Sequence, residues 1–204
     1  AWRLAVRHGR PALAAAAAQR LSKQYAGQGE FAQARDHLRH ARRQLIASGN
    51  HSQLPVLTYN DAGLAEHMGD FDHAIELYRQ VLQEAPEERP SSLRISAWLS
   101  IDRLGSLDDS SAARQAAYRE AVLLNEPPSL VQALLARGRA LLADGNTVAA
   151  RAALIQARAT PGLKPVFELE TELLRFGVWI DLVEGDLDGA EQQLDALADH
   201  LRQE

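Results

Sequence analysis

The sequence predicts an all-α protein built from antiparallel helix pairs that stack into an elongated array. Two observations carry this prediction. Glycines recur at spacings of 40, 36, 40 and 40 residues, and apolar side chains lie at helical spacing before and after each of them. No segment keeps the apolar–polar alternation that is typical of a β-strand.

The composition is that of an ordinary folded protein. Of the 204 residues, 46 % are hydrophobic and 24 % are charged, and there is no cysteine. These values exclude wholesale disorder, disulfide frameworks and cysteine nucleophiles. The 27 acidic residues outnumber the 22 basic ones, giving a net charge of −5, which argues against a dedicated nucleic-acid binder. No apolar run approaches the roughly 18 residues that a membrane span needs.

The recurring glycines mark the turn inside each helix pair. Four of these turn glycines are followed five residues later by alanine: Gly29 by Ala34, Gly69 by Ala74, Gly145 by Ala150 and Gly185 by Ala190. Glycine supplies the left-handed conformation that such a turn requires. Gly105 starts a further copy, in which we expect Asp108–Ser111 to be inserted before the helix.

Each repeat contains a first helix before the turn glycine and a second helix after it. The first helices carry apolar rows that end near the turn, and the second helices carry rows that start just after it. We expect repeats over residues 11–50, 51–89, 90–126, 127–163 and 164–204, separated by prolines (Pro11, Pro55, Pro86, Pro90, Pro127, Pro128, Pro161 and Pro165). Ala1–Arg10, with Trp2, Leu4 and Val6, predicts part of a further helix at the N-terminus. The chain begins without methionine, so we expect a fragment of a larger protein.

The second repeat resembles a tetratricopeptide repeat. It has Ala62 seven residues before Gly69, then Gly69-Asp70-Phe71, Ala74, Tyr78 and Pro86, at the offsets of that family. The resemblance implies a right-handed α-solenoid whose first helices line a concave face and whose second helices line a convex face. Residues 1–204 would then form one solenoid domain. The period exceeds the usual 34 or so residues and is similar to that of bacterial regulators and sensor proteins.

The sequence contains none of the common enzyme motifs. There is no phosphate loop, dinucleotide fingerprint, Gly-x-Ser-x-Gly or His-Glu-x-x-His. His37 and His40 share a helix face, but no carboxylate or cysteine nearby supplies an obvious third metal ligand. We therefore expect neither an enzyme nor a cofactor nor a metal site.

Two further groups of residues have structural interpretations. The basic run of Arg35, His37, Arg39, His40, Arg42 and Arg43 is interpreted as a solvated convex face, with a protein, nucleic-acid or lipid contact as the alternative. Trp98 and Trp179 stand among apolar residues, so we expect both in the core.

The predicted binding site is a polar and basic track on the concave face. In the resembled fold this face is lined by the residues nine, six and two before each turn glycine. Those positions and their neighbours give the candidate groove residues Arg20, Lys23, Tyr59, Asn60, His67, Arg103 and Arg139. Cations and hydrogen-bond donors in a groove suit the carboxylates of an acidic or C-terminal peptide.

The leading hypothesis is a non-enzymatic protein–protein interaction scaffold, part of a larger bacterial regulatory or assembly protein. It would bind a protein or peptide, use no nucleic acid through this domain and reside in the cytoplasm, with the periplasm as the alternative. A second hypothesis is an inducer-sensing domain of a transcriptional activator or signalling enzyme, with a pocket formed by Trp98, Tyr59 and Arg103. A third is a periplasmic docking module of export machinery. Apolar residues at both ends, Trp2 and Leu201, predict self-association through the solenoid ends.

Overall fold

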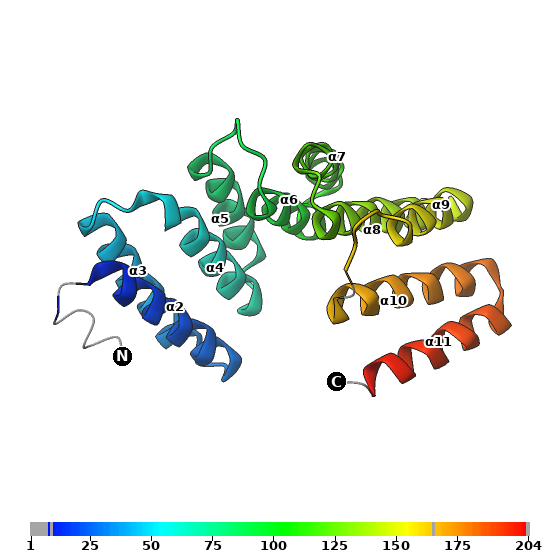
Figure 1. The fold of residues 1–204 in the computed structure, drawn as a ribbon, viewed down its shortest axis with the longest axis horizontal. Coiled ribbons are helices and arrows are strands. Elements are labelled where there is room, and N and C mark those ends of the chain that lie inside the picture. Colours follow the sequence, from blue (N-terminus) through cyan, green and yellow to red (C-terminus); the bar gives the residue numbers. More distant parts are fainter. Residues whose placement is uncertain (1–7, 9, 165, 203–204) are drawn as a thin grey trace. The chain divides into compact units, whose positions relative to one another are not determined.

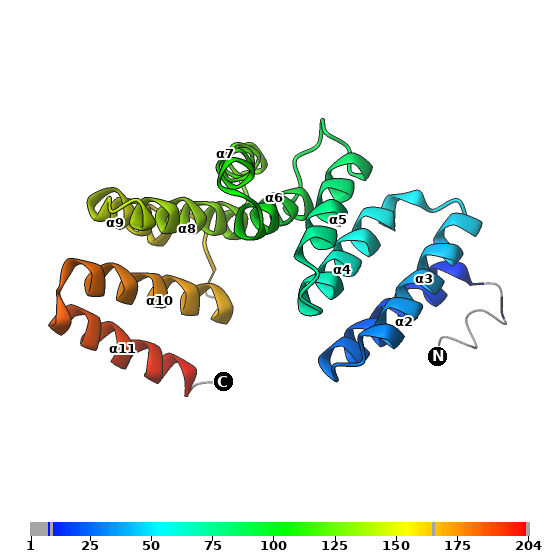
Figure 2. The ribbon, with the colours of Figure 1, turned by 180° about the vertical axis from the view of Figure 1, so that it is seen from behind.

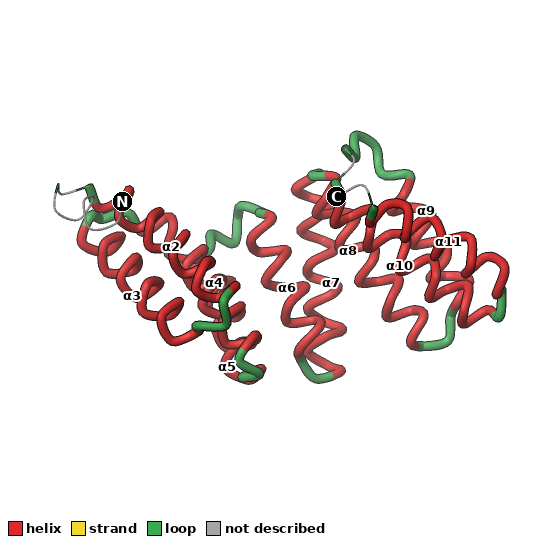
Figure 3. Tube along the Cα trace, turned by 90° about the horizontal axis from the view of Figure 1, so that it is seen from below, coloured by secondary structure: helices red, strands yellow, loops and turns green. Residues whose placement is uncertain are grey.

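The computed structural model describes residues 8, 10–164 and 166–202, and within them it contains ten α-helices and no strand (Figure 3). The helices are α2 (Pro11–Gly27), α3 (Phe31–Ala47), α4 (Leu54–His67), α5 (Phe71–Glu84), α6 (Ser92–Leu104), α7 (Leu107–Leu124), α8 (Pro127–Ala143), α9 (Thr147–Arg158), α10 (Phe167–Glu184) and α11 (Leu187–Leu201). A short 3₁₀ turn, η1 (His51–Gln53), precedes α4. The all-α prediction is confirmed.

Four pairs of helices that are neighbours in sequence pack closely against each other. Helix α2 packs on α3, α4 on α5, α8 on α9 and α10 on α11 (Figures 1 and 2). Successive pairs are joined by contacts of α3 with α4, α5 with α6, and α9 with α10. This is the packing of stacked helix pairs, in which each pair covers the apolar side of its neighbour.

The chain forms two compact units, Ala1–Ser110 and Ser111–Glu204, with the boundary inside α7. Each unit has an apolar core where second helices meet the first helices of the next pair. In the first unit that core includes Leu38 and Leu45 of α3 with Leu57 and Leu64 of α4. In the second it includes Leu154 of α9 with Leu169, Leu173, Phe176 and Ile180 of α10. A single array over residues 1–204 stays a prediction, and so does its right-handed twist.

The turn glycines lie where the sequence predicts and have the expected conformation. Gly29, Gly69, Gly145 and Gly185 have φ values of 77° to 78°, and each is followed by a second helix that begins two residues later. Asp70, Asn146 and Asp186 cap three of these helices by accepting a hydrogen bond from the backbone N–H three residues on. Such caps satisfy N–H groups that the helix itself leaves unpaired.

The third repeat differs from the expectation. Gly105 has φ −78°, outside the left-handed region, and α7 starts directly at Leu107. The predicted insertion of Asp108–Ser111 is therefore wrong, because these residues form the first turns of α7. Ser110 takes the place of the alanine found in the other repeats, and its hydroxyl donates to the carbonyl of Asp102 at 2.7 Å.

Close packing explains the small residues of the first helices. A Cβ added at Gly138 would lie 2.6 and 2.7 Å from ring carbons of Phe176, so only glycine lets this aromatic ring approach α8. Ala62 of α4, the equivalent residue, is completely buried.

The remaining expectations concern the prolines, the N-terminus and the membrane. Pro11, Pro55 and Pro127 lie at the starts of α2, α4 and α8, as predicted. Residues 1–7 and 9, which include Trp2, Leu4 and Val6, lie outside the described residues, and the expected helix there lies outside them too. None of the helices in the described part of the chain combines the length and apolarity of a membrane span.

Candidate peptide-binding surface

The predicted groove residues lie on the first helices and reach solvent within each unit. Arg20 and Lys23 are on α2, Tyr59, Asn60 and His67 on α4, Arg103 on α6, and Arg139 on α8. The charged members and His67 are exposed, whereas Tyr59 and Asn60 are half-buried. The first six residues belong to the first unit and Arg139 belongs to the second, so two separate parts of the surface are described below.

In the first unit, Arg103 is engaged by a carboxylate of the same unit. Its Nη1 and Nη2 atoms lie 2.7 and 2.8 Å from the two carboxylate oxygens of Glu66 on α4. This hydrogen-bonded pair lowers the pKa of the Glu66 carboxyl and raises the pKa of the Arg103 guanidinium. Arg103 therefore joins α6 to α4, and a partner carboxylate would compete with Glu66 for it.

Two tyrosines complete this cluster. The Tyr78 hydroxyl, from α5, donates to Glu66 Oε2 at 3.1 Å, and burial raises the pKa of that hydroxyl. The Tyr59 ring lies 5.3 Å from the Tyr78 ring at an interplanar angle of 60°, a favourable tilted arrangement. Tyr59 and Arg103, two of the predicted site residues, are thus linked through Tyr78 and Glu66.

His67 has a packing contact. Its imidazole stacks on the ring of Phe31 from α3, with centroids 6.2 Å apart and an interplanar angle of 10°. The contact joins the first helix of one pair to the second helix of the preceding pair.

In the second unit, Arg139 belongs to a row of charges. Its Nη1 atom lies 2.9 Å from Glu172 Oε2 on α10, and Arg175 Nη1 lies 3.4 Å from the other oxygen of the same carboxylate. Two guanidinium groups therefore share one carboxylate, which leaves a net positive charge at an exposed surface.

Trp179 extends this row on the surface, although its sequence pattern predicted a core position. It lies one helical turn beyond Arg175 on α10 and is 52 % exposed, so the prediction of a core position is wrong for Trp179. The exposed Leu182 and Val183 follow it. Trp179 and Val183 lie six and two residues before Gly185, which are positions of the binding face in the resembled fold. The apolar neighbours of Trp179 in sequence favoured a core position instead.

Trp98 lines an open cavity and is not in the core, so the prediction of a core position is wrong for Trp98 as well. It is half-buried on α6, beside an open cavity of about 460 Å³ between the end of α5, the loop after it and α6. The lining residues are Leu82, Gln83, Glu84, Ala85, Pro86, Glu87, Glu88, Arg94 and Trp98. Tyr59 and Arg103 do not line this cavity, and the expected pocket of Trp98, Tyr59 and Arg103 stays a prediction.

The basic run on α3 is only partly a solvated face. Arg39, ion-paired with Asp36 at 3.2 Å, is exposed, as expected. Arg35, in contrast, contacts Asp61 of α4 at 3.1 Å. Arg42 donates to the Thr58 hydroxyl at 2.5 Å and lies 3.5 Å from Glu84 of α5. The interpretation as a convex face is therefore wrong for Arg35 and Arg42, which join successive pairs.

The second unit repeats this type of junction. Arg151 of α9, like Arg35, lies six residues after its turn glycine. Its Nη2 atom lies 2.6 Å from Asp181 Oδ1 and 2.5 Å from Glu184 Oε2, both on α10. Asp181 is buried and also accepts a hydrogen bond from the Gln193 amide of α11. In both units an arginine of a second helix is therefore paired with an acidic residue of the next first helix.

Comparison with known proteins adds no family. No protein-family model matches the chain, and no curated protein shows significant similarity to its sequence.

Proposed function

We propose that this chain is a non-enzymatic helical-repeat module that binds a protein or peptide segment through the exposed side of its first helices. The resemblance to tetratricopeptide repeats supports this proposal, because the first helices of that family line the binding face. The long period supports a place within a larger bacterial regulatory or assembly protein.

The observation that carries the proposal is the row Arg139, Glu172, Arg175 and Trp179 on α8 and α10. Exposed tryptophan is unusual, and tryptophan and arginine are the residue types that contribute most binding energy at protein interfaces. The two guanidinium groups share a single carboxylate, so an incoming acidic group finds donors that Glu172 does not saturate. An apolar side chain beside that acidic group would cover Trp179.

A peptide-display selection on the whole chain tests this function. Selected peptides should combine an acidic residue with an apolar one, and Trp179→Ala should weaken their binding by at least about tenfold, which corresponds to 1.4 kcal/mol. Reversal of the two arginines of the row, Arg139→Glu with Arg175→Glu, should have an effect of similar size. Fluorescence anisotropy of labelled peptides measures these affinities.

The matched control is the double reversal Arg39→Glu with Arg43→Glu on α3. These side chains are exposed, and screened surface charges contribute only about 0–1 kcal/mol each. Loss of binding in this control, with binding intact in the groove variants, would assign the working surface to the second helices instead.

The cavity beside Trp98 favours a second candidate function, the sensing of a small molecule. Its volume of about 460 Å³ falls within the range of ligand pockets, and it combines apolar Leu82, Pro86 and Trp98 with carboxylates. A metabolite screen by thermal shift checks this candidate, because a ligand of the folded state raises the melting temperature. A stabilising metabolite whose effect disappears in Trp98→Ala would support it.

A further inference from the structure

The last described helix, α11, carries a row of exposed leucines. Leu187, Leu194 and Leu201 are 69 %, 48 % and 49 % exposed. Residues seven apart lie on the same side of an α-helix, so the three side chains form one apolar stripe along α11.

Equivalent residues of the other second helices are buried. The residue nine positions after the turn glycine is Leu38 in α3, Tyr78 in α5 and Leu154 in α9, and each of these is only 2–3 % exposed. Its counterpart in α11 is Leu194. The residue sixteen positions after the turn glycine is the fully buried Leu45 in α3, and its counterpart in α11 is Leu201. Leu194 and Leu201 thus occupy positions that a neighbouring helix normally covers, whereas the position of Leu187 is also exposed in α5, at Phe71.

The inner junctions show what kind of helix covers such positions. Leu38 and Leu45 share a core with Leu57 and Leu64 of α4. Leu154 shares one with Leu169 and Leu173 of α10. In both junctions the covering element is a helix with apolar residues four or seven positions apart.

The charge beside the stripe is opposite to that of the inner junctions. Six residues after the turn glycine, α3 and α9 carry Arg35 and Arg151, which pair with Asp61 and Asp181 of the covering helix. The equivalent residue of α11 is Glu191.

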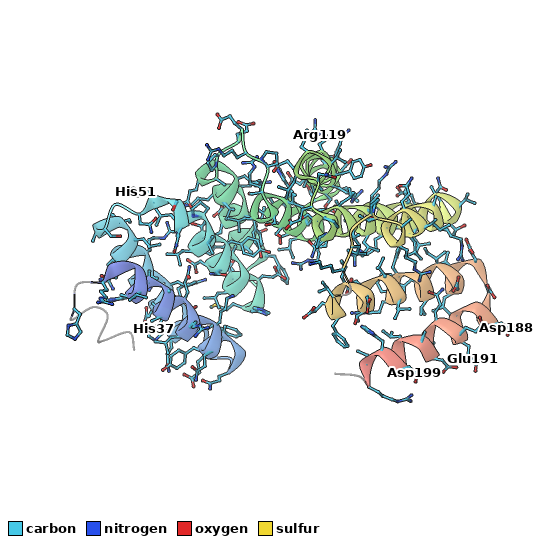
Figure 4. The ribbon with its side chains drawn as sticks, in the orientation of Figure 1. His37, His51, Arg119, Asp188, Glu191 and Asp199 are labelled. Carbon is cyan, nitrogen blue, oxygen red and sulfur yellow. The ribbon has the colours of Figure 1, made fainter. Side chains whose placement is uncertain are left out.

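The reversal continues along the helix. Ten and fourteen residues after the turn glycine, α3 has Arg39 and Arg43, whereas α11 has Asp195 and Asp199. Arg39 and Arg43 stay exposed although α4 covers α3, so Asp195 and Asp199 add negative charge beside the covered strip and not within it. Figure 4 shows Asp188, Glu191 and Asp199 along α11. A helix with acidic residues, like those that cover α3 and α9, would meet repulsion on α11, whereas a basic one would be attracted.

We propose that α11 is a docking surface for a basic amphipathic helix of a partner protein. The apolar side of that helix would cover Leu187, Leu194 and Leu201, and an arginine or lysine would face Glu191, with Asp195 at the edge of the contact. This surface is separate from the groove on the first helices. Burial of the leucines supplies the affinity, and Glu191, which stands where the inner junctions have arginine, selects the charge of the partner.

Two synthetic peptides test the proposal with the whole chain. The first is an amphipathic helix of about five turns with a leucine row flanked by arginines. The second is identical except that glutamate replaces every arginine. Fluorescence anisotropy at about 0.15 M salt should show that the arginine peptide binds at least about tenfold more tightly than the glutamate peptide. Glu191→Arg with Asp195→Arg should reverse this preference.

A matched pair of variants locates the site. Leu194→Asp should weaken binding of the arginine peptide by at least about tenfold. Ile155→Asp, at a 61 % exposed position of α9, should leave that affinity unchanged. Circular dichroism of both variants should match the wild-type spectrum, because both side chains are exposed.

Two results would overturn the proposal. One is equal binding of the arginine and glutamate peptides, which would show that the carboxylates select nothing. The other is sedimentation in which the chain self-associates and Leu194→Asp makes it monomeric, which would show that a second copy covers α11. Either result leaves the groove proposal intact, because that one is tested on α8 and α10.

Discussion

Asp181 is the carboxylate on which the junction of the second unit depends. It is buried and receives hydrogen bonds from Arg151 and from Gln193, so a charge that would be costly alone is compensated. The sequence gives no sign of this role, because Asp181 and Arg151 are 30 residues apart and many other acidic residues are available.

Asp181→Ala should therefore destabilise the protein by about 2 kcal/mol, since it leaves donors of Arg151 and Gln193 without their acceptor. Urea denaturation measures the loss. Asp199→Ala is the matched control, because the ion pair of Asp199 with Arg202 is exposed and its removal should cost less than about 0.5 kcal/mol. Equal losses in the two variants would contradict the importance assigned to burial.

The pair of Glu66 and Arg103 predicts a pH dependence. Arg103 lowers the pKa of Glu66 in the folded state, so the pair stabilises the fold fully above the ordinary value of 4.5. This contribution is lost as the pH falls through the lowered value. Chemical denaturation at a series of pH values should show that Arg103→Met is less stable than wild type at neutral pH and that the difference shrinks in acid. A difference that grows in acid would contradict the assignment.

At the scale of elements, residues close in sequence determine the turns and the helix caps. The packing of helices against each other determines which side chains are exposed. The four turn glycines, the caps Asp70, Asn146 and Asp186, and the all-helical fold follow from residues close in sequence. The exposure of Trp179 and the pairing of Arg35 with Asp61 depend on which helix covers which side. Apolar periodicity alone does not determine that choice. The start of α7 was missed because Ser110 replaces the alanine that marks the other repeats.

Two glycines of α8 and its turn should respond differently to alanine. Gly138→Ala would place a methyl group against Phe176 and should destabilise the fold by about 1–3 kcal/mol through overpacking. Gly145→Ala meets no atom within 4 Å but has φ +77°, so its cost of about 1 kcal/mol is conformational. Combining each change with Phe176→Leu separates the causes, because only the Gly138→Ala penalty should then fall.

At the scale of the whole molecule, protection should be uneven along the chain. Helix α11 buries only Ala190 among its described residues, whereas α3, α9 and α10 each bury several side chains between neighbours. Opening of a helix covered on one side costs less free energy.

Hydrogen exchange read by mass spectrometry should therefore be fastest in α11 and slowest in the cores around Leu45 and Leu154. Addition of the arginine peptide should slow exchange in α11 specifically. Uniform exchange in all helices would mean that the pairs unfold only together.

The turn glycines have one more consequence, which concerns handedness at the level of single residues. Gly185 has φ +77° and open space where a side chain would project. A left-handed backbone that strains an L-residue is the natural conformation of its mirror image. D-Alanine at position 185, introduced by semisynthesis, should therefore stabilise the protein by about 0.4–1 kcal/mol, because it restricts the unfolded chain without straining the native turn. L-Alanine at the same position should destabilise the protein. A higher melting temperature for the D-alanine variant than for the L-alanine variant would show that the turn requires a left-handed backbone.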